Sequence, residues 1–283
     1  MTGIQARPVR ARRIRFSYPE GGLQRHYVQG DLVMSHVIAY LSATFPEGED
    51  FFVRSVRNHT DQVVDPELKE QVRGFIGQEV THSREHVALN ERLQDMGYPT
   101  RFADRRTRAV LRLYEKFLSP LTCLAITAAL EHYTAVLAET LLGDEDARAL
   151  LGSTEVRKML LWHAYEESEH RAVAFDVYRT VGGSERRRIW TMRLVTLAFI
   201  GSTVAFTTLS LLRDRAAYNP IRLIRSLLAL RHSPFVKISV RQRLREYNKP
   251  GFHPDDTDNT ALLEHWHPEL FGAAGQLADN LAR

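Results

Sequence analysis

Three segments of the chain carry glutamates and histidines in the middle of stripes that are otherwise apolar at helical spacing. Side chains at positions i, i+3, i+4 and i+7 share one face of a helix, so each stripe is expected to face a core. The stripes are Phe75, Glu79, His82, His86, Leu89 and Leu93; Leu124, Ala128, Glu131, Ala135, Ala138 and Leu142; and Val156, Leu160, His163, Glu167, His170, Ala174 and Val177. A charge in a bundle core costs several kcal/mol unless it is paired or bound to a cation. We therefore expect a helix bundle whose polar residues meet around a cation.

Helix-boundary signals agree with this expectation. Asp65 and Ser119 are each followed by proline, which is the pattern of a helix cap with proline at the first helical position. Ser153 is placed to cap a further helix that ends at a Gly-Gly pair. The predicted helices cover residues 65–97, 119–143 and 153–183.

The segment before them, residues 32–58, has helical periodicity but contains Pro46. Because proline removes a backbone donor and disrupts a helix interior, we predict two helices here, with Glu49 in the first turns of the second. Strand-type alternation is missing from the sequence, so the expected fold is all-α: a ferritin-like helix bundle with extra N- and C-terminal helices. Its predicted parts are an N-terminal arm (1–30), a di-metal helix bundle (31–183) and a basic C-terminal helical extension (184–283).

The polar positions form a ligand pattern. Two helices supply Glu-x-x-His and two supply one Glu each, which is typical of ferritin-like di-iron and di-manganese bundles. Residues three apart on a helix lie about 5–6 Å from one another, so a Glu can bridge two metals while its His binds one. Carboxylates with imidazoles favour iron or manganese. The predicted ligands are Glu49, Glu79, His82, Glu131, Glu167 and His170, with Glu47 and Asp50 as competitors of Glu49.

Four further residues flank this set. His163 is either a satisfied core histidine or a seventh ligand. His86 is expected to support a ligand or to handle protons. Thr134, one turn after the glutamate of its helix, can point its hydroxyl into the site, and Glu166 can bind in place of Glu167. Cys123 is interpreted as a core residue, and because it is the single cysteine the chain has no internal disulfide.

The stretch QEVTHSREHVAL also contains H-x-x-E-H, the inverted zinc-peptidase pattern, at His82, Glu85 and His86. That interpretation leaves the other carboxylates of the core unexplained. The di-iron interpretation accounts for them and leaves only Glu85 without a role, and this residue can then face solvent. A third E-x-x-H, at residues 264–267, lies outside the bundle pattern and is not expected to bind metal.

The segments FPEGEDFFVRSVR, QEVTHSREH, EHYTA, WHAYEESEHRAVAFDVY and PGFHP resemble the bacterial family of predicted metal-dependent hydrolases. The resemblance spans about residues 30 to 270 and implies hydrolysis. The ligand order alone is also similar to that of the di-iron arylamine N-oxygenases. Applied to this chain, the ligand order of those enzymes implies seven ligands: Glu49, Glu79, His82, Glu131, His163, Glu167 and His170.

The C-terminal third has a different character. The net charge of the chain is only +4, but lysine and arginine far outnumber acids between residues 183 and 250. Residues 194–212 carry no charge, and the segment after them alternates basic and apolar residues. We expect either a buried helix or contact with an anionic membrane surface through residues 194–245. The basic segment lacks interleaved aromatics, so nucleic acid is not expected as a partner.

These observations favour a cytoplasmic di-iron protein, peripheral on the inner membrane if the basic region contacts lipid. The first hypothesis is an oxygenase or oxidase that uses O2, an electron donor and an apolar, amphipathic or lipid-like small molecule, with two Fe ions or Mn in their place. The alternative is a metal-dependent hydrolase of an ester or amide, of di-metal or zinc type. A third hypothesis is a non-enzymatic protein that stores iron or senses redox state.

Overall fold

The computed structural model describes residues 9–152 and 154–281, and within these ranges the chain is helical, with a single isolated bridge between Ile14 and Leu281 and no strand. The expected all-α class is confirmed. The α-helices are α1 (Leu32–Arg57), α2 (Pro66–Asp95), α3 (Thr100–Phe117), α4 (Pro120–Gly143), α5 (Glu145–Ala149), α6 (Glu155–His170), α7 (Val173–Thr180), α8 (Glu185–Leu211), α9 (Pro220–Leu230), α10 (Ile238–Glu246) and α11 (Thr260–Phe271).

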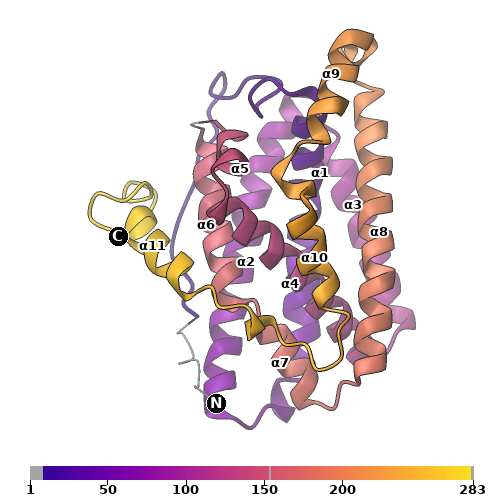
Figure 1. The fold of residues 1–283 in the computed structure, drawn as a ribbon, viewed down its shortest axis with the longest axis vertical. Coiled ribbons are helices and arrows are strands. Elements are labelled where there is room, and N and C mark those ends of the chain that lie inside the picture. Colours follow the sequence, from indigo (N-terminus) through magenta and orange to yellow (C-terminus); the bar gives the residue numbers. More distant parts are fainter. Residues whose placement is uncertain (1–8, 153, 282–283) are drawn as a thin grey trace.

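The long helices α1, α2, α4 and α6 stand side by side as a bundle, and α7 continues the line of α6 (Figure 1). Helix α3 packs mainly on α1, while α8 lies along one edge against α4 and α1. The later helices cover the bundle from outside, with α9 on α1 and α10 on α4. The starts of α2 and α4 are as predicted, because Asp65 and Ser119 cap them with their side chains.

The predicted break at Pro46 is wrong, because α1 runs through the proline as one helix. Proline leaves the carbonyl of the residue four positions earlier without its usual helical partner. That carbonyl belongs to Ser42, and it accepts a hydrogen bond of 2.9 Å from the Asn90 side chain of α2 instead. A neighbouring helix therefore satisfies the group that the proline leaves open, and Glu49 lies inside a long helix.

The third predicted helix is divided in the structure, since α6 ends at His170 and α7 begins at Val173. At the junction the carbonyl of Ser168 accepts from Asn259 Nδ2 at 3.0 Å, a contact from a distant part of the chain. The predicted cap, Ser153, lies outside the described residues, and Thr154 caps α6. Helix α3 was not predicted from the sequence.

The N-terminal arm crosses the bundle before α1 and is fastened to α2. The backbone N–H of Phe16 donates to Glu85 Oε2 at 2.8 Å, and Arg84 donates to Glu85 and to the Ile14 carbonyl. Glu85 is buried, so the expectation that it faces solvent is wrong. The arm donates a hydrogen bond to its carboxylate, and the helical periodicity of α2 contains no information about the arm.

Candidate metal centre

The seven residues of the expected ligand set are all buried, and they come from α1, α2, α4 and α6. The first group of ligand atoms comes from Glu49, His82 and His163, whose atoms lie within 4.8 Å of one another. Nε2 of His163 lies 2.8 Å from Glu167 Oε1 and 3.8 Å from Glu49 Oε1. Nδ1 of His82 lies 3.6 Å from the same oxygen of Glu167.

The second group adjoins the first and comes from Glu79, Glu167 and His170. Nε2 of His170 lies 3.1 Å from Glu79 Oε1, 3.3 Å from Glu131 Oε2 and 3.7 Å from Glu167 Oε2. The two oxygens of Glu167 thus face different groups, one toward His163 and the other toward His170. Glu167 is placed to bridge two cations, and Glu131 approaches the second group from α4.

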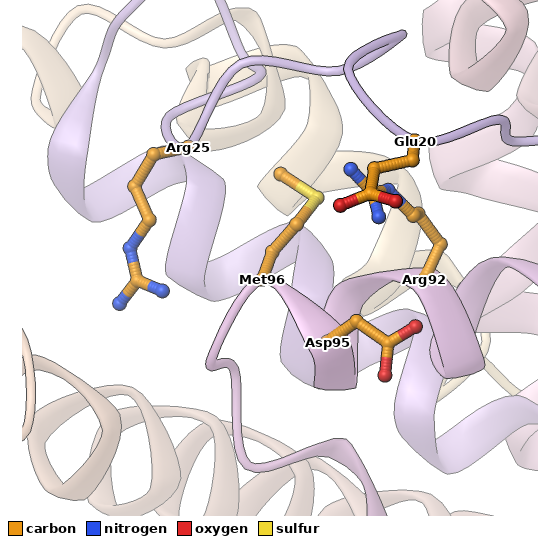
Figure 2. Close-up of a pocket in the computed structure, with 5 residues that line it drawn as sticks. All are labelled: Glu20, Arg25, Arg92, Asp95 and Met96. Atoms are coloured by element: carbon orange, nitrogen blue, oxygen red, sulfur yellow. The ribbon is translucent and has the colours of Figure 1, made fainter.

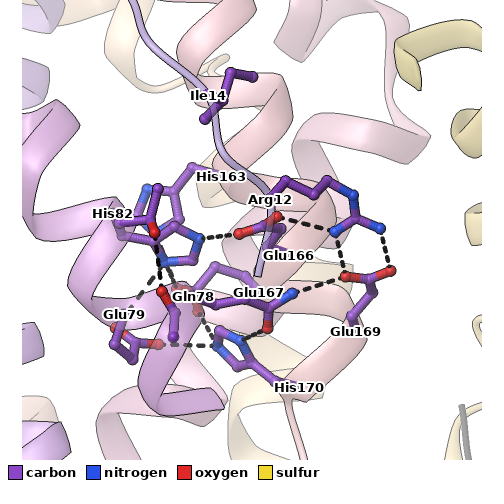
Figure 3. A network of polar contacts seen from close by, with 12 residues as sticks. Arg12, Ile14, Gln78, Glu79, His82, His163, Glu166, Glu167, Glu169 and His170 are labelled. Carbon is purple, nitrogen blue, oxygen red and sulfur yellow. Dashed lines mark hydrogen bonds and ion pairs between the residues drawn. The ribbon is translucent and has the colours of Figure 1, made fainter. Parts of the chain in front are cut away.

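Each histidine turns one nitrogen into the groups and binds a protein partner through the other. Figure 3 shows this for His82 with Glu166 and for His170 with Gln78. Nε2 of His82 lies 3.0 Å from Glu166 Oε2, and Nδ1 of His170 lies 2.8 Å from Gln78 Oε1. Partners of this kind fix the ring orientation and tautomer of a metal-binding histidine. Glu166 therefore lies behind a predicted ligand rather than in place of Glu167.

The third histidine is held by a longer chain of hydrogen bonds. Nδ1 of His163 is 2.8 Å from His86 Nε2, and Nδ1 of His86 is 2.9 Å from Ser42 Oγ, which donates to Asn90 Oδ1 at 2.7 Å. Phe45 stacks on the His86 ring at a centroid distance of 4.5 Å. These contacts hold the His86 ring in place, and His86 is connected to the groups of ligand atoms through His163.

A second set of supporting residues reaches the centre from the arm. Arg12 donates to Glu166 Oε1 at 2.9 Å and forms two bonds of 2.7 Å with Glu169 (Figure 3). Gln78 Nε2 donates to the same Glu169 at 2.8 Å. The arm therefore fixes Glu166 and Gln78, and through them the histidines of α2 and α6. Sequence reasoning missed Arg12, Gln78 and Glu169, and the one available signal was the position of Gln78 beside Glu79.

The electrostatics of the groups disfavour a metal-free state with all carboxylates ionised. Burial, reinforced by neighbouring carboxylates, raises the pKa of Glu49 and of Glu79 well above the ordinary value. The same causes raise the pKa of Glu131 to about 7. Burial acts against ionisation of Glu167 and His170 too, but their mutual attraction lowers the pKa of the first and raises that of the second.

The residues present fit a bound cation. Within the described residues, nine buried side-chain atoms of the set make no hydrogen bond, although buried polar atoms are normally satisfied. They are both oxygens of Glu49, Glu79 and Glu131, Oε2 of Glu167, Nδ1 of His82 and Nε2 of His170. All are carboxylate oxygens or the inward nitrogens of imidazoles, which are the donors that iron and manganese accept.

Other sequence candidates lie elsewhere. The hydroxyl of Thr134 donates to the Glu131 carbonyl of its own helix at 2.9 Å. Glu47 pairs with Arg108 outside the groups, and Asp50 is exposed. In the third E-x-x-H, on α11, both Glu264 and His267 are exposed. Cys123 is buried, as expected. Glu85 binds the arm, so the H-x-x-E-H residues are not assembled as one site.

Two surface pockets of the described structure lie away from the centre. One is lined by charged residues of the arm and of the end of α2, among them Glu20, Arg25 and Arg92 (Figure 2). The other lies between α1 and the start of α4 and is lined by residues such as Arg54 and Glu115. Neither contains a residue of the ligand set.

A helix bundle that buries four glutamates and three histidines in two adjoining groups defines a candidate metalloprotein. A family model described as predicted metal-dependent hydrolase matches residues 10–258. The chain belongs to this family, which confirms the family resemblance drawn from its motifs. A search of the curated proteins found no match, and neither did a search of the solved structures.

Proposed function

We propose that this protein is an enzyme with a dinuclear metal centre. One observation carries the proposal: two groups of buried ligand atoms adjoin each other and share the carboxylate of Glu167. Glu49, His82 and His163 would hold one ion, and Glu79, Glu131 and His170 the other. Four carboxylates would balance the charge of two divalent cations, which removes the cost of burying them.

Hydrolysis of an ester or amide is the first candidate reaction, because the family is described by it. The sequence alone placed oxidation first, and family membership reverses that order. When bound, the metal pair would supply an activated water and polarise a carbonyl. The chain would orient the ligands through Glu166, Gln78 and His86, and His86 would hold a proton at Nδ1, between His163 and Ser42 in its hydrogen-bond chain.

Oxidation with O2 is the second candidate, and the composition of the ligand set favours it. Four carboxylates neutralise two divalent ions, which lowers their ability to activate water, and the same ligands suit an ion that is oxidised to a higher charge. All seven residues are buried, and O2 needs only a narrow path to reach them. The substrate of this reaction would be an apolar or amphipathic molecule.

Metal analysis tests the dinuclear centre. Protein purified from iron-replete cells should hold close to two ions of iron or manganese per chain. A single tightly held zinc ion that iron cannot displace would contradict the proposal, because seven ligands exceed what one four-coordinate zinc uses.

The two reactions are separated by loading chelated protein with Fe(II), Mn(II) or Zn(II). Metal-dependent cleavage of a p-nitrophenyl ester, lost in Glu131→Gln, would support hydrolysis. Stoichiometric O2 uptake by the Fe(II) protein, with no ester cleavage by any metal form, would support oxidation. Glu85→Gln separates the zinc-peptidase pattern from both, because the general base of that pattern is required for turnover while the arm contact tolerates an amide.

A further inference from the structure

Helix α8 presents large apolar side chains to the outside, unlike the usual surface helix of a water-soluble bundle. Three of its hydroxyl-bearing residues, Thr191, Thr207 and Ser210, are buried against the protein, together with Met192 and Val195 near the start of the helix. Six of its large apolar residues face outward, and among them Leu197 is 70% exposed and Val204 62% exposed. A surface helix normally buries its apolar face and presents its polar face to water. The outward face of α8 is therefore suited to an apolar environment.

This face is long and uncharged between Leu194 and Leu212. The part of this stretch that lies within α8, residues 194–211, extends about 27 Å. Both α8 and α4 are long and apolar enough to cross a membrane by length and composition, but α4 is 72% buried over its apolar window and α8 only 17%. The burial difference separates α4, a core helix, from α8, most of whose apolar window is not buried by the described chain.

Basic and aromatic residues stand at the two ends of the face. Arg193 is exposed at the start and packs over the Trp190 ring at 5.1 Å. Arg213 is exposed at the other end, where Tyr218 follows with its ring in solvent. Trp and Tyr concentrate where proteins meet the lipid headgroup region, and arginine is attracted to anionic headgroups.

Helix α9 likewise presents apolar side chains to the outside. In α9 the apolar residues Ile221, Ile224 and Leu228 are exposed, while the polar Ser226 is buried. Its hydroxyl donates to Asp31 at 2.6 Å and accepts from the Val33 N–H at 2.8 Å, which holds α9 on the start of α1. Two successive helices thus present apolar faces outward because polar contacts hold their other sides to the bundle.

We propose that the outward surface of α8 and α9, hereafter the α8–α9 face, docks on a lipid bilayer that contains anionic lipid. Helix α8 packs along α1 and α4, so it would lie along the membrane rather than cross it (Figure 1). A second copy of the chain fits the face less well. Arginines stand at both ends, so parallel and antiparallel pairing alike would bring arginine against arginine.

Some arginines of the basic region that was expected to contact lipid are bound within the protein instead. Arg222 donates to His26 Nδ1 at 2.8 Å, and Arg243 pairs with the buried Glu139. These two arginines are occupied within the protein. Arg193 and Arg213 at the ends of α8 are exposed, as is Arg225 on α9, so these three can reach headgroups.

Vesicle co-sedimentation of the full chain tests the proposal. Wild type should sediment with vesicles of 3:1 phosphatidylcholine and phosphatidylglycerol at low salt, and more weakly with pure phosphatidylcholine. The double variant Arg193→Gln/Arg213→Gln should bind the anionic vesicles roughly fivefold more weakly for each arginine removed. The double variant Leu197→Asn/Val204→Asn should lose the part of the binding that survives high salt.

Matched controls come from α2, whose exposed residues lie away from α8. Val80→Asn/Val87→Asn changes two exposed valines, and Lys69→Gln/Arg73→Gln removes two exposed charges. Both controls should bind vesicles as wild type does, and all variants should keep the metal content of wild type.

Two outcomes would overturn the proposal. One is weak binding without specificity, seen as failure of wild type to sediment with anionic vesicles at low salt or as equal losses in the α2 controls. The other is a stable dimer in light scattering that Leu197→Asn dissociates, which would assign the α8–α9 face to a second copy. Neither outcome bears on the metal centre, which is read out by metal content.

Discussion

Nδ1 of His163 lies 2.8 Å from Nε2 of His86, on the side of the His163 ring opposite Glu167. With Nε2 of His163 facing the ligand groups, Nδ1 carries the proton and donates to His86. His86 then donates to Ser42, whose hydroxyl donates to Asn90. A defined tautomer is thereby fixed along four side chains, and it leaves the inward nitrogen of His163 free to bind a cation.

Replacing His86 should therefore loosen the metal rather than unfold the protein. His86→Phe leaves Nδ1 of His163 without a partner, and we expect metal affinity to fall about 10- to 100-fold. Chelator competition measures this change. The control is His132→Phe, which alters a buried histidine that contacts the Arg243 carbonyl outside the centre. It should lower stability but leave metal affinity unchanged, and equal losses in both variants would contradict the role of His86.

Two buried glutamates of α4 should differ in their effect on metal content. Glu131→Gln removes a predicted ligand and should lose at least one metal per chain. Glu139→Gln, on the same helix, weakens the buried pair with Arg171 and should lower the free energy of unfolding by about 1–3 kcal/mol while both metals remain. Elemental analysis and chemical unfolding measure the two effects. Full metal retention by Glu131→Gln would remove it from the ligand set.

The metal-free protein should have an unusual pH dependence at the centre. The pKa of Glu131 is raised from 4.5 to about 7, so the folded state holds a proton that the unfolded chain releases at lower pH. This carboxyl therefore becomes increasingly destabilising as pH rises from about 4.5 to about 7. Glu131→Gln should make the chelated protein more stable than wild type at pH 8, on the order of 1–3 kcal/mol, and equal to it near pH 4.5.

Urea unfolding of the two chelated proteins across this pH range measures the difference. The same comparison with metal bound should reverse in sign, because only wild type keeps the full ligand set. A variant that is less stable than wild type in both states would show that the carboxylate is stabilised by the protein alone.

The arm should control how fast metal leaves the centre. Arg12→Gln breaks its contacts with Glu166 and Glu169, and through Glu166 it loosens His82. Metal release to a chelator should be about tenfold faster or more. Arg13→Gln changes an exposed neighbour in the same arm and should release metal at the rate of wild type. Equal rates in all three proteins would show that the arm plays no part in holding the centre.

Much of the bundle could be predicted from the sequence because the signals are local. Helical spacing places Glu79, His82 and Glu167 on core faces whatever lies opposite, and proline after Asp65 or Ser119 marks a helix start in any context. Helix α3 was missed although its apolar residues recur at helical spacing, and in the structure only Thr100, Ala103 and Leu111 of this helix are buried. The ligand residues were grouped because they stand near the middle of the apolar stripes of three helices. Their metal-binding roles stay a prediction.

Contacts between distant residues decided the rest. The helix through Pro46 depends on Asn90 of another helix, and the burial of Glu85 depends on the arm. The periodicity of α1 and α2 does not indicate either partner, because it reflects only residues of the same helix.

By itself, the sequence determined the all-α class, the starts of α2 and α4 and the burial of the seven predicted ligand residues, because these depend on residue spacing within single helices. The tertiary structure decided which nitrogen of each histidine faces inward, which residues hold the other nitrogen, and that Arg12 joins the centre from the arm. It also decided that α8 buries Thr207 and Ser210 and leaves Leu197 and Val204 exposed. An uncharged helix has the same sequence pattern whether it is buried or exposed, so only its packing against α1 and α4 distinguishes the two.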